Sequence, residues 1–120
     1  MSKVNISSSL KSDKENHIFK GKGIKRDNKI IYLDENVQTI VTLDNIITIE
    51  RKSDYELKLN LKNGINLKGT YKTKYGTFET KTFTKYQKQT ENELEIIYQL
   101  FIDDTLIDTF TYKLKISLDT

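Results

Sequence analysis

The sequence predicts an all-β protein folded as one antiparallel β-barrel, and three observations point to this fold class. Thr, Ile, Tyr and Phe, which fit pleated strand surfaces, are abundant, and there is no proline. Apolar and polar residues alternate over many short segments. Turn-forming Gly, Asn and Asp residues separate these segments at short spacing. We therefore expect a meander of about eight to ten strands that closes on itself.

The composition favours a single domain over residues 1–120, located in the cytoplasm. A chain of 120 residues buries about two-thirds of its unfolded surface, which is enough for one core. The absence of cysteine excludes disulfides and thiolate chemistry, and it fits a reducing compartment. There is no signal-peptide pattern at the N-terminus and no apolar run of about 20 residues, so we expect no membrane partner.

The first half of the chain predicts five strands. Residues 4–10 form the first, and residues 17–25 and 29–33 surround the turn at residues 26–28. Residues 37–43 and 46–52 form a hairpin around Asp44-Asn45. With a two-residue turn, this hairpin is apolar on both faces: Val41 and Leu43 on one, and Ile40, Ile47 and Ile49 on the other. An apolar outer face predicts a covering element or a contact surface.

The second half predicts five more strands, at residues 55–61, 65–73, 78–86, 94–102 and 106–115. We set their register by side-chain parity, because a slip of one residue exchanges the two faces of a strand. The expected pairs are Leu61 with Ile65, Thr73 with Phe78, Tyr71 with Thr80, Gly69 with Thr82, Thr82 with Tyr98, Thr84 with Ile96, Ile102 with Leu106, Tyr98 with Phe110, Ile96 with Tyr112 and Leu94 with Leu114.

Charge is distributed unevenly between these strands. Residues 68–88 carry a net charge of +5 and residues 89–110 one of −6, although the whole chain is only at +3. Pairing of oppositely charged strands explains the contrast. The expected outer pairs are Lys72 with Glu79, Lys85 with Glu95, Glu95 with Lys113 and Glu93 with Lys115. The weak overall positive charge and this pairing argue against a nucleic-acid partner.

A mixed row of hydroxyl and apolar side chains faces the predicted interior. Its polar members are Tyr71, Thr73, Thr80, Thr82, Thr84, Tyr86, Tyr98, Asp108 and Tyr112. Buried hydroxyls need hydrogen-bond partners. A barrel of about eight strands is either filled by side chains or holds one small molecule. The hydroxyls can therefore bond to one another, to water or to a ligand.

No catalytic, metal or cofactor site is predicted. His17 is the only histidine, and without carboxylates at ligand spacing we expect an ordinary surface strand residue. Ser7, Ser8 and Ser9 lack a base with an orienting acid, and Asp34-Glu35 is typical of a turn. The Gly-x-Gly at residues 21–23 lacks the helix start that a phosphate site needs.

The segment "YKTKYGTFETKTFT" at residues 71–84, followed by "IIYQL", resembles the YwiB-like family of small uncharacterised bacterial proteins. The resemblance is carried by Tyr71, Thr73, Tyr75, Gly76, Thr80, Thr82, Thr84 and Tyr98 and, upstream, by Tyr32, Glu35 and Arg51. The resemblance implies a calycin-type, lipocalin-like β-barrel, and it implies no established activity.

We therefore expect a non-enzymatic module that binds a small, partly apolar molecule inside the barrel. The expected ligand contacts are Tyr71, Thr80, Thr82, Thr84, Tyr98 and Tyr112, with Arg51 as an anion partner at the rim. The alternative is an interaction protein that acts through the apolar outer face of the 37–52 hairpin or through a homodimer interface, without an internal ligand. A third alternative is an enzyme acting on a small ligand, for which the sequence offers no nucleophile with a base.

Overall fold

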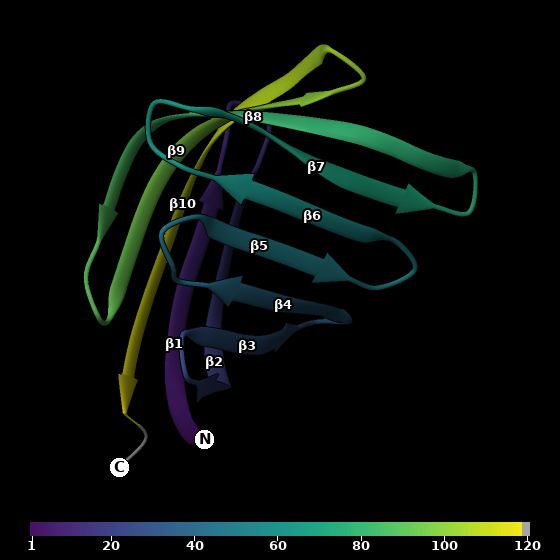
Figure 1. Cartoon of the computed structure of the whole chain (residues 1–120). Coiled ribbons are helices and arrows are strands. Elements are labelled where there is room, and N and C mark those ends of the chain that lie inside the picture. The colour runs from purple at the N-terminus through teal and green to yellow at the C-terminus, as the bar shows by residue number, and fades with distance from the viewer. Residues whose placement is uncertain (119–120) are drawn as a thin grey trace.

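Ten antiparallel strands form a closed barrel in the computed structural model, which describes residues 1–118. Each strand pairs with the next one along the chain, and β1 pairs with β10 to close the sheet (Figure 1). The strands are β1 (Ser2–Lys11), β2 (Asn16–Arg26), β3 (Lys29–Asp34), β4 (Val37–Thr42), β5 (Ile47–Lys52), β6 (Glu56–Leu61), β7 (Asn66–Thr73), β8 (Gly76–Gln89), β9 (Glu93–Ile102) and β10 (Thr105–Leu118). The predicted all-β meander barrel is confirmed. Residues 1–118 contain no helix able to cross a bilayer.

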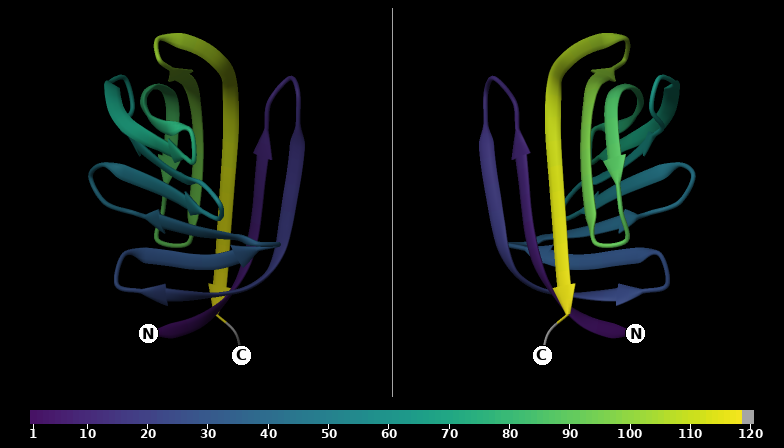
Figure 2. Two further views of the ribbon diagram at one scale, coloured as in Figure 1. Left: turned by 90° about the vertical axis from the view of Figure 1, so that its right-hand side faces the viewer. Right: turned by 90° about the vertical axis from the view of Figure 1, so that its left-hand side faces the viewer.

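The barrel wall combines long and short strands. Strands β8 and β10 have 14 residues each, whereas β3, β4, β5 and β6 have six each. The short strands run across the direction of β1, β2 and β10 (Figures 1 and 2). The wall therefore turns sharply between β2 and β3. Strand pairing is short at two places in the wall, the β2–β3 and β6–β7 junctions, which are called corners below. Only four residue pairs join β2 to β3, and three join β6 to β7.

Two glycines allow the close approach of strands at these corners. A Cβ atom on Gly23 of β2 would lie 2.2 Å from Ile6 Cδ1 and 2.6 Å from the Ile31 carbonyl oxygen. A Cβ atom on Gly69 of β7 would lie only 2.0 Å from the Lys58 carbonyl oxygen. Because any side chain would collide with a backbone oxygen, glycine is the residue that fits both corners.

The core follows the alternation of apolar residues along each strand. Successive side chains point to opposite faces, so β9 buries Leu94, Ile96, Tyr98 and Leu100 and leaves the residues between them partly exposed. Val41, Ile47, Ile49, Leu59 and Leu61 fill the opposite wall and are at most 1% exposed. The apolar interior is therefore continuous across the barrel.

The register predicted for the last hairpin is confirmed except next to its turn. Tyr98 pairs with Phe110, Ile96 with Tyr112, Leu94 with Leu114, Glu95 with Lys113 and Glu93 with Lys115. Lys115 Nζ lies 3.6 Å from Glu93 Oε1. Next to the turn, a bulge between Leu106 and Asp108 shifts the register, so Ile102 pairs with Thr105 and not with Leu106.

The registers predicted from β6 to β9 are wrong by two residues, although the facing of most side chains is unaffected. The observed pairs are Leu57 with Tyr71, Tyr71 with Phe78, Gly69 with Thr80, Thr73 with Gly76, Thr82 with Leu100 and Thr84 with Tyr98. Ile65 forms a bridge to Lys62 and not to Leu61. The hairpin between β7 and β8 closes through two residues, which is tighter than we expected.

Two further predictions are wrong because β8 contains a bulge. The register shifts between Thr84 and Tyr86, so Glu95 pairs with Lys88 and not with Lys85. The extra residue turns Tyr86 away from the interior, and its side chain is 42% exposed. Lys72 pairs with Thr77, while the ion pair of Glu79 is made by Lys68, with Nζ 3.7 Å from Oε2.

The hairpin of β4 and β5 does not have two apolar faces. Val41 pairs with Ile49 and Thr42 with Thr48, which leaves an odd number of residues in the loop. Compared with the two-residue turn that we predicted, this one-residue difference exchanges the faces of β5. Ile47 and Ile49 therefore lie inside with Val41, and the outer face carries Ile40 opposite Glu50.

Candidate functional site

A pocket of about 150 Å³ lies at the end of the barrel where the β1–β2, β3–β4 and β5–β6 connections meet. Its lining comes from the ends of β1 to β5, the following loops and the middle of β10. The lining residues are Ser8, Leu10, His17, Tyr32, Asp34, Glu35, Val37, Thr39, Arg51, Tyr55 and Tyr112. Apolar and aromatic side chains with a few converging polar groups are typical of small-ligand sites.

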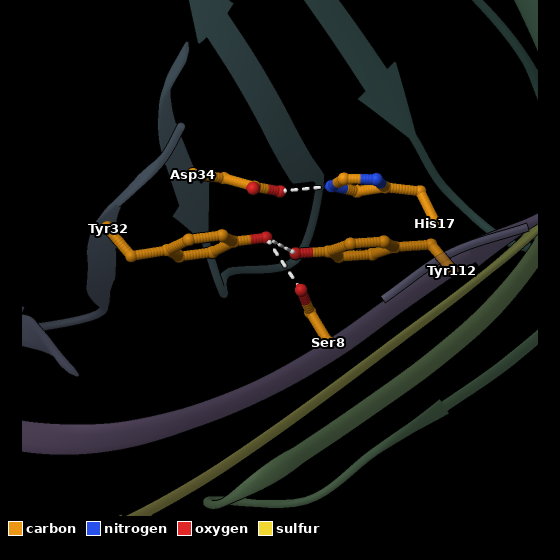
Figure 3. Close-up of polar contacts among 5 residues, drawn as sticks. All are labelled: Ser8, His17, Tyr32, Asp34 and Tyr112. Atoms are coloured by element: carbon orange, nitrogen blue, oxygen red, sulfur yellow. Dashed lines mark hydrogen bonds and ion pairs between the residues drawn. The ribbon is translucent and has the colours of Figure 1, made fainter. Parts of the chain in front are cut away.

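Three hydroxyl groups from different strands meet on one side of this pocket (Figure 3). Tyr32 Oη lies 2.7 Å from Tyr112 Oη and 3.3 Å from Ser8 Oγ. The three residues are at most 7% exposed. The Tyr32 ring is held in place by stacking on Phe19, with the ring centroids 4.9 Å apart. The group is therefore rigid and satisfies most of its own hydrogen bonds.

A second bridge crosses the pocket from β2 to β3. His17 Nε2 lies 2.7 Å from Asp34 Oδ2, and Figure 3 shows this pair above the two tyrosines. Because β2 and β3 pair only from Gly23 to Arg26, His17 lies beyond their hydrogen-bonded part. The side chains of His17 and Asp34 thus join two strands whose backbones have separated. Among residues 1–118, no three His, Asp or Glu side chains are grouped to hold a metal ion.

Arg51 brings positive charge to the pocket. Its Cζ lies 5.9 Å from the centroid of the Tyr112 ring. Burial raises the pKa of Tyr112 well above its usual value, and the neighbouring Tyr32 raises it further, while Arg51 lowers it. Burial also raises the pKa of Tyr98 to about 12, against the opposite effect of Arg51. Both phenols are therefore neutral hydrogen-bond donors at physiological pH.

The structure divides the predicted site residues into two groups. Arg51 and Tyr112 line the pocket. Tyr98 is buried beside it, stacked on Phe110 with centroids 5.7 Å apart. Tyr71 is half-buried on β7, between Tyr55 and Phe78.

The threonines of β8 lie elsewhere in the interior and do not line this pocket. Thr82 Oγ1 donates a hydrogen bond to the Asn60 carbonyl oxygen at 2.7 Å. The hydroxyl oxygens of Thr80 and Thr84 are buried without a hydrogen-bond partner among the described residues. Thr80, Thr82 and Thr84 therefore do not join Arg51 and Tyr112 in one site.

Sequence reasoning missed several pocket residues. We expected His17 to be an ordinary surface residue and Asp34 a turn acid, yet the two form a bridge. Ser8 was considered only as a nucleophile. A signal did exist upstream, because Tyr32, Glu35 and Arg51, which carry the upstream part of the family resemblance, all line the pocket.

The fold and this pocket define the class: a small, closed ten-stranded β-barrel with a polar pocket at one end. The chain belongs to the family described as "Domain of unknown function (DUF1934)", whose model matches residues 2–116. The resemblance to YwiB-like proteins is thereby confirmed. No curated protein matches the chain significantly.

A solved structure supports the same fold. The ywiB protein from Bacillus subtilis, known from a crystal structure, superimposes with a TM-score of 0.62 at 20% sequence identity. The match covers 98% of this chain and 91% of the ywiB chain. Likeness at this level of identity establishes the barrel and leaves the function to be argued from the pocket.

Proposed function

We propose that this protein is a non-enzymatic module that binds a small, partly apolar molecule in the pocket at the end of the barrel. The observation that carries the proposal is the mixed lining of that pocket. Leu10, Val37 and the tyrosine rings provide apolar surface, and Arg51 with the hydroxyl cluster provides polar contacts. The proposed ligand position is nearer the barrel end than the one expected from the sequence. Of the expected ligand contacts, the proposal keeps Arg51 and Tyr112.

The size of the pocket limits the ligand. An apolar cavity of about 150 Å³ in another protein accommodates benzene, so this pocket of about 150 Å³ suits a compact molecule. Most drug-sized ligands occupy about 300–1,000 Å³. The lipocalin-like kinship implied by the family resemblance supports an internal ligand only by analogy.

Native mass spectrometry of the purified protein tests the proposal, with screening of small molecules by thermal shift. A ligand at ten times its Kd contributes about 1.4 kcal/mol and raises Tm by about 5 °C for a chain of this size. Val37→Trp should fill the pocket and abolish the shift. Gln38→Trp, at the next residue on the outer face, should preserve it. Failure of every compound to bind, or equal binding by Val37→Trp, would contradict the proposal.

A second candidate function is homodimerisation through the outer face of β2 and β3. Ile24, Ile31 and Leu33 lie around an open hollow of about 590 Å³ on this face. Leu33 is 62% exposed and Ile24 is 36% exposed, and adjoining exposed apolar side chains are typical of contact surfaces. Sedimentation should then show a dimer that Leu33→Lys dissociates and that Lys58→Glu, on the outer face of β6 and away from this surface, leaves intact. A monomer at high concentration would exclude this candidate.

We also propose a cytoplasmic location, on the basis of the cysteine-free composition. Fractionation of cells that produce the tagged protein checks this, and recovery from an extracytoplasmic fraction would refute it.

A further inference from the structure

One edge of β2 lacks a neighbouring strand over part of its length. On one side, β2 pairs with β1 from Asn16 to Lys25 without a bulge. On the other side, its pairing with β3 begins only at Gly23. Figure 2 shows the β1–β2 hairpin standing apart from the shorter strands. The segment from Asn16 to Gly21, which we call the free edge, therefore has a strand on one side only among residues 1–118.

The free edge presents backbone groups that β1 does not use. Along an antiparallel strand, the N–H and C=O groups of alternate residues point to the same neighbour. Arg26 and Lys29 close a two-residue turn, so Arg26 points its backbone groups toward β3. By the same alternation, Asn16, Ile18 and Lys20 point theirs to the side where β3 is absent. A row of such groups is a template for an added strand.

The β6–β7 corner is closed by side chains, whereas the free edge is not. At that corner, Asn60 Nδ2 donates to the Lys68 carbonyl oxygen at 2.8 Å, and Thr82 Oγ1 donates to the Asn60 carbonyl oxygen at 2.7 Å. At the free edge, the bridge between His17 and Asp34 joins a ring nitrogen to a carboxylate oxygen. The bridge therefore leaves the backbone groups of the free edge available.

The two strands at the free edge are basic. Together they carry six lysine or arginine residues, two in β1 and four in β2, and neither strand contains an aspartate or glutamate. Ile18, which is 59% exposed, and Lys20 lie on the outer face. The acids nearest in the chain, Asp13 and Glu15, lie in the loop at the Asn16 end. A strand that carries carboxylates opposite Lys20 would therefore be attracted to this edge.

The same charges disfavour a second copy of this chain at the free edge. If two copies of β2 paired antiparallel about a two-fold axis, the two Lys20 side chains would lie close together. Like charges opposite each other destabilise paired strands. Lysine on a strand edge is one of the means by which natural proteins prevent such self-pairing. The edge therefore favours a different chain of opposite charge.

We propose that the free edge of β2 binds an extended acidic segment of another protein by β-strand addition. The segment runs antiparallel to β2 and exchanges backbone hydrogen bonds with Asn16, Ile18 and Lys20. Its outward side chains include carboxylates near Lys20. Its inward side chains are apolar, because their neighbour on β2 is Phe19, which packs against the core. This inference adds a protein partner and is independent of the small ligand proposed for the pocket.

A labelled peptide tests the class of partner by fluorescence anisotropy at constant, low ionic strength. The sequence Glu-Val-Glu-Val-Thr-Val-Thr, with acetyl and amide ends, places its second glutamate opposite Lys20 when it pairs antiparallel. The same peptide with lysine in place of both glutamates should bind at least about tenfold more weakly. Equal binding by the two peptides would overturn the acidic class. Absence of binding at about 1 mM of the acidic peptide would overturn the whole inference.

Two N-methylated peptides test the backbone bonds separately from the charges. Methylation of the second glutamate and the first threonine removes N–H groups that face β2, and it should lower the affinity at least about tenfold. Methylation of the first two valines removes N–H groups that face away from β2, and it should change the affinity less than about threefold. Equal loss in the two peptides would show that no strand is added.

Two variants of the protein locate the site. Ile18→Pro removes an N–H group of the free edge and no bond to β1, and it should weaken the acidic peptide at least about tenfold. Ile18→Val keeps the N–H group and should preserve binding. Lys20→Glu should weaken the acidic peptide by about three- to tenfold and strengthen the lysine peptide. Lys58→Glu, on the outer face of β6, is its control.

Unchanged binding by Ile18→Pro would overturn the assignment to this edge. Thermal unfolding checks that Ile18→Pro is folded, and if it is not, Lys20→Glu and the N-methylated peptides decide. Sedimentation of the protein alone tests the other occupant. A dimer that Ile18→Pro dissociates would show that a second copy occupies the free edge and would overturn the proposal. We expect a monomer, or a dimer that Ile18→Pro leaves intact.

Discussion

The barrel interior contains two groups of buried hydroxyls that behave differently. At the pocket, Ser8, Tyr32 and Tyr112 come from three strands and meet within hydrogen-bond distance. On β8, Thr80 and Thr84 lie four positions apart on one strand, with Thr82 between them, and their hydroxyls are unpartnered among the described residues. Inward residues two positions apart on a strand are separated by about 6.6 Å, too far for their hydroxyls to pair. A polar site in a barrel therefore requires residues from different strands.

The two corners of the wall should show the largest effect of a single substitution. Gly69→Ala would place a Cβ atom 2.0 Å from the Lys58 carbonyl oxygen, and that backbone cannot move without breaking the β6–β7 pairing. We expect a loss of more than about 3 kcal/mol of unfolding free energy, or failure to fold. Urea denaturation measures it. In Gly21→Ala the new atom lies 2.7 Å from Phe19 Cζ, at the far end of a side chain and not on the backbone, so a cost as large as that of Gly69→Ala would contradict this explanation.

Alkaline pH should weaken the pocket side of the barrel through its buried phenols. Burial raises the pKa of Tyr98 from 10.0 to about 12, so the folded protein holds this proton at pH values at which the unfolded chain loses it. This stabilisation is present below pH 10 and is lost as the pH rises toward 12. The loss is about 3 kcal/mol. Urea denaturation of Tyr98→Phe across this range should show a shallower decline, and parallel curves would refute it.

Replacing Thr82 or Thr80 with valine should change the stability of the protein in opposite directions. Thr82→Val removes the hydrogen bond to the Asn60 carbonyl oxygen and should cost about 1 kcal/mol. Thr80→Val removes a buried hydroxyl that has no partner among residues 1–118 and should stabilise the protein by about 1 kcal/mol. Thermal unfolding of the two variants distinguishes them. A loss of stability in Thr80→Val would mean that its hydroxyl is satisfied in solution.

The bridge between His17 and Asp34 should have the smallest effect on stability. The His17 side chain is 49% exposed, and pairs of this exposure contribute about 0–1 kcal/mol. We therefore expect His17→Gln to lower the unfolding free energy by less than about 1 kcal/mol. A cost above about 2 kcal/mol in urea denaturation would show that the bridge holds β2 and β3 together.

The sequence predicts the fold class better than the relation between strands. Alternation identifies ten strands and the pairing of the last hairpin, because the hydrophobic pattern and the charges there agree on one register. Alternation does not reveal the bulge between Thr84 and Tyr86, nor that the β4–β5 loop has an odd number of residues. One added residue leaves the alternation within each strand unchanged. These two features account for the reversed facing of Tyr86 and of the β5 isoleucines.

The candidate site was predicted only in part for a similar reason. Parity shows that Tyr112 and Thr82 both point inward, but it cannot show which inward residues meet across the barrel. Tyr32 and Tyr112 are 80 positions apart in the chain, and their contact depends on how the whole wall curves. Arg51, which carries part of the upstream family resemblance, lines the pocket together with Tyr32 and Glu35.

Closure of the barrel by β1 and β10 makes the pocket depend on two strands that lie far apart in the chain. The closing pairs include Val4 with Leu118, so β1 keeps an unpaired edge until β10 has been synthesised and has paired with it. Tyr112 belongs to that segment, and neither the hydroxyl cluster nor the floor under Arg51 exists before it arrives. A chain truncated before β10 would expose two strand edges and be prone to aggregation. The proposed pocket therefore depends on β10, and only molecules that include this strand can form it.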